Sequence, residues 1–118
     1  MLPARHRLRS SADFASVVRG PGGSRSGGRL IVVHANQTDA RAGRPPRVGF
    51  VVSKGVGGAV VRNRTKRVLR HLLAARVHGI PDGCDLVVRA NPPAAAASTP
   101  QLADELDRLL PKALRRRR

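Results

Sequence analysis

The sequence predicts an α+β fold, a single-domain α/β sandwich in which helices pack on one small mixed sheet. Its 118 residues are enough for one domain with one core, so residues 1–118 are expected to form a single unit. Helix-like and strand-like segments follow in the order α-β-β-α-β-α, with room for one extra short strand. One strand is apolar on both faces, as expected of a strand that is covered on both sides.

The first helix is predicted by its cap and by an apolar stripe. Ser10 and Asp13 have the spacing of an N-terminal capping box, and the residues that follow recur at one-turn spacing: Phe14, Val17 and Val18. A short helix should therefore run from about Ser11 to Arg19. Segment 20–28 is rich in glycine and contains a proline, so it is predicted to be a flexible loop without regular structure.

Two β-branched, apolar segments predict the next two strands. In segment 30–35 the side chains alternate between two faces, one of which carries Leu30, Val32 and His34. Segment 36–46 is predicted to be a second flexible loop. Segment 47–53 is apolar on both faces, and we therefore expect it to lie centrally in its sheet.

A long helix is predicted over residues 60–77, which contain no proline or glycine and are rich in arginine, leucine and alanine. At about 100° per residue, one arc of this helix carries Val61, Thr65, Val68, Leu69 and Leu72. The opposite arc carries polar and mostly cationic residues: Arg62, Asn63, Lys66, Arg67 and Arg70. Gly79 and Pro81 then provide a typical helix stop.

The C-terminal third predicts one more strand and one more helix. Segment 84–90 reads as a third core strand, and segment 91–98 as a linker. Thr99 and Pro100 open a last helix, with proline at its first position. One face of that helix is apolar: Leu102, Leu106, Leu109 and Leu110. We expect Pro111 to disturb the helix, and residues 115–118 to form a basic tail.

The charge balance points to a polyanionic partner. Lysine and arginine total 23 against 7 acidic residues, giving a net charge of +16. Only three of the basic residues are lysines, and arginine suits phosphate and stacking contacts, which favours nucleic acid over a membrane surface. The single cysteine allows no internal disulfide. The sequence shows no apolar run of membrane-spanning length and no signal peptide, so we expect a soluble cytoplasmic protein.

The strongest functional signal lies in segment 62–70. It could be a solvated helix face, but it lacks the interleaved acids that would form intrahelical ion pairs. An amide among the cations suits contacts with bases or riboses, and the preceding glycines allow a nucleic-acid backbone to approach the helix start. The predicted RNA-binding residues are Arg62, Asn63, Arg64, Lys66, Arg67 and Arg70.

These motifs resemble the protein component of bacterial ribonuclease P. The resemblance is carried by Arg7-Leu8 with Asp13-Phe14, by 47–54, by 58–64 with its Arg62-Asn63-Arg64 motif, and by Lys66-Arg67 with Arg70. It implies a left-handed β-α-β crossover, against the usual right-handed rule. It also implies a protein subunit that binds a catalytic RNA and the 5′ leader of precursor tRNA, and so assists endonucleolytic removal of the leader.

The resemblance implies two working surfaces. The long helix would contact the catalytic RNA, and a cleft between the first helix and the sheet would receive the single-stranded leader. The implied cleft residues are Phe14, Val18, Val32, His34, Val51, Ser53 and Lys54. Phe14 would stack on leader bases, although a core phenylalanine is the alternative interpretation. Val18 and His34 replace family aromatics, so stacking should be weaker in this chain.

Three other interpretations fit part of the sequence. Gly55, Gly57 and Gly58 suggest a dinucleotide-binding turn, but Val60 replaces its third glycine and Asp82, the next acidic residue, lies too far along the chain. A P-loop fails because its elements stand in the wrong order. A ribosomal protein or RNA chaperone of similar fold fits the charge equally well, and only the motifs in 47–70 argue against it.

No catalytic constellation is visible in the sequence. The four histidines are scattered without a paired cysteine or carboxylate: His6, His34, His71 and His78. We therefore expect no catalytic residue, metal site, cofactor or small-molecule substrate in the protein. By the family resemblance, hydrolysis belongs to the RNA subunit, which uses bound Mg²⁺ ions to activate water.

Overall fold

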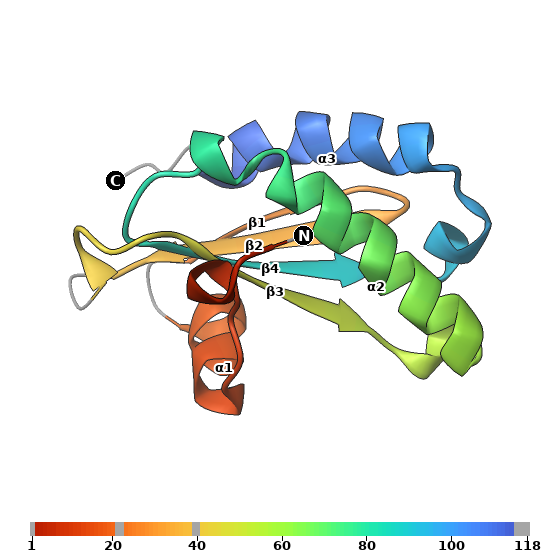
Figure 1. Ribbon diagram of the computed structural model, residues 1–118, viewed down its shortest axis with the longest axis horizontal. Helices are drawn as coiled ribbons and strands as arrows, with labels where there is room; N and C mark the ends of the chain where they lie inside the picture. The colour runs from red at the N-terminus through yellow and green to blue at the C-terminus, as the bar shows by residue number, and fades with distance from the viewer. Residues whose placement is uncertain (1, 21–22, 39–40, 115–118) are drawn as a thin grey trace.

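The computed structural model describes residues 2–20, 23–38 and 41–114, and its elements follow the order α-β-β-β-α-β-α. The helices are α1 (Ser11–Arg19), α2 (Ala59–Ala74) and α3 (Thr99–Leu114), and the strands are β1 (Ser24–Gly27), β2 (Ile31–Gln37), β3 (Arg47–Val52) and β4 (Cys84–Ala90). Short 3₁₀ turns are η1 (Ala4–His6), η3 (Lys54–Val56), η4 (Val77–Gly79) and η5 (Pro92–Ala96). The predicted sandwich is confirmed: α2 and α3 cover one face of the sheet and α1 lies on the other (Figure 1).

The four-stranded sheet has the order β1-β2-β4-β3. β1 pairs antiparallel with β2, β2 antiparallel with β4, and β3 parallel with β4. The parallel β3-α2-β4 unit that the resemblance required is therefore present, and the left hand of its crossover stays a prediction. β4 is central, so our expectation that segment 47–53 lies centrally is wrong.

Burial on both faces explains that error. β3 lies at the sheet edge, but helices on opposite faces of the sheet shield its side chains. An apolar sequence indicates that side chains are covered, and it does not indicate how many strands lie beside the segment. The N-terminal segment follows the outer edge of β3, where the Leu8 N–H donates to the Val48 carbonyl at 3.0 Å. Part of the exposed edge is thereby paired.

The extra short strand is β1, inside the segment predicted as the first loop. Ser24 to Gly27 pair with Ala35 to Val32, and the Gly28 N–H donates to the Ile31 carbonyl at 2.9 Å. Main-chain pairing to β2 compensates for the poor strand propensity of serine and glycine. A local sequence pattern does not show this pairing. The second predicted loop begins later than expected, because β2 continues to Gln37. Residues 21–22 and 39–40 of these loops lie outside the described residues.

α1 has the predicted bounds, and its cap is formed. The Asp13 N–H donates to Ser10 Oγ at 3.0 Å, as the capping spacing indicated. α2 has the predicted apolar arc, with Thr65, Leu69 and Leu72 buried, but it ends at Ala74 because the chain tightens into η4.

The C-terminal elements differ from expectation in two places. Within the predicted linker, η5 forms and Ala94 is buried. α3 buries its four leucines as predicted, but it continues through Pro111 to Leu114. Pro111 is exposed and close to the helix end, so the disturbance that we expected there is wrong. The tail at 115–118 lies outside the described residues, and none of the described helices is long and apolar enough to cross a membrane.

Candidate nucleic-acid interface

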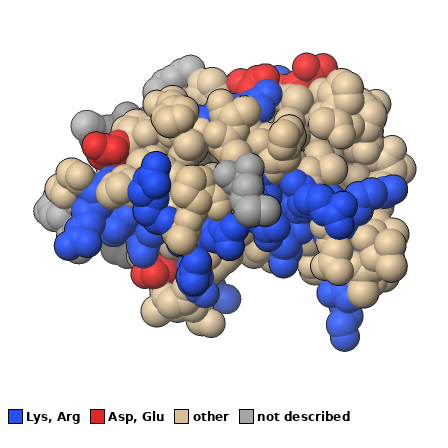
Figure 2. All heavy atoms as spheres, in the orientation of Figure 1, with Lys and Arg blue, Asp and Glu red and all other residues tan. Residues whose placement is uncertain are grey.

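Cationic side chains gather on the face that presents α2 and the N-terminal segment. Figure 2 shows them as a band across the middle of the molecule, with the acidic side chains of this face around its borders. α2 itself contains five lysine or arginine residues and no acid: Arg62, Arg64, Lys66, Arg67 and Arg70. Such a surface attracts a polyanion, because no carboxylate on the helix neutralises it.

The predicted residues of α2 do not all face the same way. Asn63 and Arg67 are exposed, whereas Arg62, Lys66 and Arg70 are half-buried. Arg64 is exposed as well, but its guanidinium donates to the Ala95 carbonyl of η5 at 3.0 Å. The structure therefore separates Arg64 from the other five predicted RNA-binding residues, since its side chain turns toward η5.

A hollow beside α1 brings together three of the predicted cleft residues. This α1 hollow has a volume of about 500 Å³ and is lined by Arg9, Ser11, Phe14, Ala15, Val18, Arg19 and Val51. Val18 is 40% exposed and adds apolar surface to this hollow. An apolar floor with arginines at the rim suits a base and its phosphate.

An ion-pair network holds α1 against the sheet. Arg47 of β3 donates to both carboxylate oxygens of Asp85 on β4, at 2.9 and 2.7 Å, and to Asp13 of α1 at 3.3 Å. The bonds to Asp85 raise the pKa of Arg47, so the guanidinium stays charged. Asn36 of β2 adds a bond from Nδ2 to the Ser16 carbonyl at 3.0 Å. Three strands thus fix the orientation of the helix that carries Phe14.

The Phe14 ring lies directly on the sheet because residue 49 is glycine. A Cβ at Gly49 would lie 2.6 Å from Cε2 of Phe14 and closer still to Cζ, so any other residue would displace the ring. Phe14 also packs beside Leu8, Val17 and Val87, which form a small apolar cluster on this side. The ring is only half-buried, so it packs on the sheet and also lines the α1 hollow.

The remaining predicted cleft residues do not line this hollow. Val32 and His34 are buried in β2, with 4% and 6% of their surface exposed. Ser53 and Lys54 are exposed just beyond β3. Burial, and then the charges of Arg89 and Arg25, lower the pKa of His34, so the ring favours its neutral form.

A second hollow lies at the outer edge of β3, and the sequence did not predict that its residues come together. This edge hollow, about 290 Å³ in volume, is lined by Arg7, Leu8, Arg9, Phe14, Val48, Gly49, Phe50, Lys66 and Arg70. Arg7, Arg9 and Phe50 were not among the predicted site residues. Arg7 belongs to the Arg7-Leu8 motif of the family resemblance, but only the folded chain brings the N-terminal segment beside α2.

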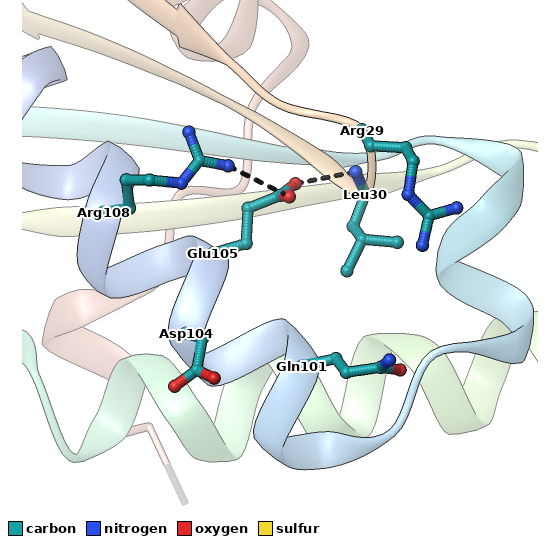
Figure 3. A pocket seen from close by; sticks show the side chains of 6 residues that line it. All are labelled: Arg29, Leu30, Gln101, Asp104, Glu105 and Arg108. Atoms are coloured by element: carbon teal, nitrogen blue, oxygen red, sulfur yellow. Dashed lines mark hydrogen bonds and ion pairs between the residues drawn. The ribbon is translucent and has the colours of Figure 1, made fainter.

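A third hollow, about 380 Å³ in volume, lies between α3 and the turn that joins β1 to β2. Glu105 points into this turn between Arg29 and Arg108, and one of its carboxylate oxygens accepts the N–H groups of Leu30 and Ile31, each at 2.7 Å (Figure 3). The other oxygen accepts from Arg108 at 3.3 Å. Glu105 therefore fixes the turn to α3. Among the described residues, no group of three or more histidine, cysteine, aspartate or glutamate side chains could hold a metal ion.

Comparison with known proteins decides the family. The family model described as "Ribonuclease P" matches residues 2–114. The chain belongs to the ribonuclease P protein family. The ribonuclease P protein component of Acidothermus cellulolyticus is 56% identical over 111 residues, which cover 93% of this chain and 89% of that protein. The component of Kocuria rhizophila is 51% identical over 98% of each chain.

Solved ribonuclease P proteins share the fold. The Staphylococcus aureus protein superposes with a TM-score of 0.78 at 27% identity, covering 93% of this chain and 98% of that one. The Thermotoga maritima protein gives 0.76 at 26% identity, with 92% and 97% covered. These matches decide against a ribosomal protein or RNA chaperone. The chain is the protein subunit of an endoribonuclease that acts in tRNA processing.

Proposed function

We propose that the α2 face binds the catalytic RNA of ribonuclease P and that the α1 hollow binds the 5′ leader of precursor tRNA. The observation that carries the proposal is the presence of two surfaces of different chemistry, α2 on one face of the sheet and the α1 hollow on the other. α2 offers cations without acids, and the α1 hollow offers an accessible aromatic ring rimmed by Arg9 and Arg19. A folded RNA needs many phosphate contacts, whereas a single strand also needs stacking.

The leader assignment is tested by the ratio of precursor to mature tRNA affinity. In the reconstituted ribonucleoprotein, Phe14→Ala should weaken precursor binding by about 1–3 kcal/mol, the value of one stacking contact. Mature tRNA, which has no leader, should bind unchanged. Phe14→Leu is the matched control for packing, since it keeps apolar bulk and loses the aromatic face. An unchanged ratio in a folded Phe14→Ala variant would assign Phe14 to the core alone.

The catalytic-RNA assignment is tested by salt dependence. Arg67→Ala should weaken assembly with the catalytic RNA and lower the slope of log affinity against log salt by about 0.9, the effect of one lost phosphate contact. Lys112→Ala on α3 is the control, because it removes one charge outside α2. Equal effects of the two substitutions would show that only net charge matters.

We further propose that the protein binds no catalytic metal and that the RNA subunit holds the Mg²⁺ ions that activate water. The arginines would partly replace the counterion screening that these ions provide. The protein should therefore raise activity most at low magnesium concentration, and the purified protein alone should cleave nothing. Cleavage of precursor tRNA by protein without RNA would overturn the assignment of catalysis.

A further inference from the structure

The edge hollow combines features that the two surfaces described above have separately. Both aromatic residues of the chain, Phe14 and Phe50, line it. So do four cations from two separate elements: Arg7 and Arg9 from the N-terminal segment, and Lys66 and Arg70 from α2. No acidic side chain is among its lining residues. The hollow therefore joins apolar ring surface to concentrated positive charge.

Most of these cations have no partner among the residues that the structure describes. Arg7 donates from Nε to the Leu2 carbonyl at 3.0 Å, but no hydrogen bond or ion pair of the Arg9, Lys66 or Arg70 side chains is formed with the described residues. Other arginines do form ion pairs with carboxylates, so the chain uses its few acids elsewhere. Like charges held around one hollow repel each other, and an anion between them would relieve that repulsion.

The strand edge adds main-chain groups. The Val48 carbonyl points outward to accept from Leu8 N–H, and β-strand peptide groups alternate in direction, so the Phe50 N–H and C=O point outward as well. Within the described residues, no bond satisfies these Phe50 groups at the outer edge. An outward donor and acceptor beside a phenyl ring suit the hydrogen-bonding edge of a base.

We propose that the edge hollow binds one nucleotide of single-stranded RNA, with its phosphate on Arg9, Lys66 and Arg70 and its base against Phe50. The volume of about 290 Å³ lies at the lower limit of small-ligand sites, roughly 300–1,000 Å³, which fits one nucleotide unit rather than a duplex.

The position of the hollow defines the path of the strand. Arg9 and Phe14 line both the edge hollow and the α1 hollow, so the two hollows adjoin each other. A strand in the α1 hollow would pass around the edge of β3 and reach α2. The inference rests on the proposed function, because it continues the proposed leader path. It also assigns Lys66 and Arg70 to this strand rather than to the catalytic RNA.

The composition of the chain makes the test direct. With two phenylalanines and no tyrosine or tryptophan, aromatic NMR spectra contain two phenyl ring systems beside those of the four histidines, and Phe14→Leu identifies which phenyl ring belongs to Phe14. Phe14 lines both hollows, whereas Phe50 lines only the edge hollow. Titration with a single-stranded RNA of five nucleotides should shift both rings. Inorganic phosphate at equal concentration should shift the Phe50 ring far less.

Matched variants locate the phosphate contact. Lys66→Gln and Arg70→Gln should each weaken oligonucleotide binding about tenfold, the effect of losing one charged hydrogen bond. Lys112→Gln and Arg5→Gln remove the same charge outside the hollow and should change affinity less than about twofold. A thermal melt of each variant confirms folding, and Lys66→Gln alone decides the test if Arg70→Gln does not fold.

The outcomes separate this inference from the proposed function. If the RNA shifts the Phe14 ring and leaves Phe50 unmoved, the leader occupies the α1 hollow alone and the edge site is wrong. If neither ring moves, the proposed leader surface fails as well. If inorganic phosphate reproduces the Phe50 shift, or if the matched controls weaken binding equally, the hollow only concentrates anions and the nucleotide assignment is overturned.

Discussion

Single side chains decide whether the sheet face beside α1 can accept a base. Gly49 lets the Phe14 ring lie on β3, and Val18 leaves apolar surface beside it. His34 differs from what the resemblance implied, because its ring is buried and does not line the hollow. The positive charges of two arginines also act on the ring and lower its pKa. Its Nε2 atom makes no hydrogen bond with the described residues. Gly49 and His34, which pair with Val87 from opposite sides, therefore have unlike roles.

Substitution of Gly49 should act through Phe14. Gly49→Ala places a methyl group where the ring now lies, so the ring must move and lose its contact with the sheet. We expect a loss of stability of about 1–3 kcal/mol and a lower ratio of precursor to mature tRNA affinity. The double variant Gly49→Ala with Phe14→Ala should lose less stability than the sum of the two single losses, because the clash disappears. Stability effects that simply add would contradict the contact.

The neutral state of His34 predicts a pH dependence of stability. Because the pKa in the folded state is lowered, the unfolded chain binds more protons in the pH range just below its ordinary pKa of about 6.5. The stabilising contribution of neutral His34 is complete above that value, and it is lost as pH falls through 6.5 toward the lowered pKa.

Denaturant unfolding between pH 7.5 and 5.5 provides the measurement. Wild type should lose more free energy of unfolding over this range than His34→Gln, which has no titrating group at position 34. The comparison removes the contribution of the other three histidines, since both proteins contain them. Parallel curves for the two proteins would show that His34 does not carry the effect.

At the scale of elements, polar contacts between distant segments orient the surfaces. Arg47 ties α1 to β3 and β4, Arg64 ties α2 to η5, and Glu105 ties α3 to the turn between β1 and β2. Each of these contacts joins residues at least 31 positions apart in the chain. The elements are thus predicted by local pattern, but side-chain contacts of long sequence separation set their relative positions.

The contact of Glu105 with the turn predicts a large and local loss of stability. Glu105→Ala leaves the buried N–H groups of Leu30 and Ile31 without their acceptor, which should cost about 1.5–3 kcal/mol. Asp104→Ala is the matched control, because Asp104 is the exposed neighbour on the same helix. Free energies of unfolding measure the difference. Equal losses in the two variants would mean that the charge of α3, and not the contact with the turn, is what matters.

At the scale of the whole molecule, charge opposes the fold. A net charge of +16 is held within a radius of gyration of 13.3 Å, and the core contains few aromatic residues to offset the repulsion. The chain neutralises little of this charge itself, because it has only seven acids. Compaction and anion binding should therefore be coupled, since an anion that binds the folded chain stabilises it.

We expect the isolated protein to be partly unfolded at low ionic strength and to gain structure as sulfate or RNA is added. Circular dichroism during a sulfate titration measures the transition. Chloride at matched ionic strength separates specific anion binding from general screening, and sulfate should act at lower ionic strength. A native spectrum without added salt, unchanged by sulfate, would show that the core alone overcomes the repulsion.

Local patterns are enough to predict the elements whose signal lies within one segment of the chain. The cap and periodicity of α1, the two arcs of α2, the apolar run of β4 and the leucine face of α3 all appear within one segment, because helix and strand side chains repeat every 3.6 or 2 residues. The cationic face of α2 was predictable for the same reason. The family resemblance added the cleft, for which residue spacing alone contained no signal.

Contacts between segments that are far apart in the chain become visible in the folded structure alone. β1 forms because β2 supplies hydrogen-bonding partners to a serine and glycine segment, and β3 is an edge strand although both its faces are shielded. The edge hollow combines residues 7–14, 48–50 and 66–70, and His34 is buried by neighbouring strands. Strand order, burial and side-chain neighbours depend on contacts between residues far apart in the chain, and a pattern that repeats within one segment does not contain them.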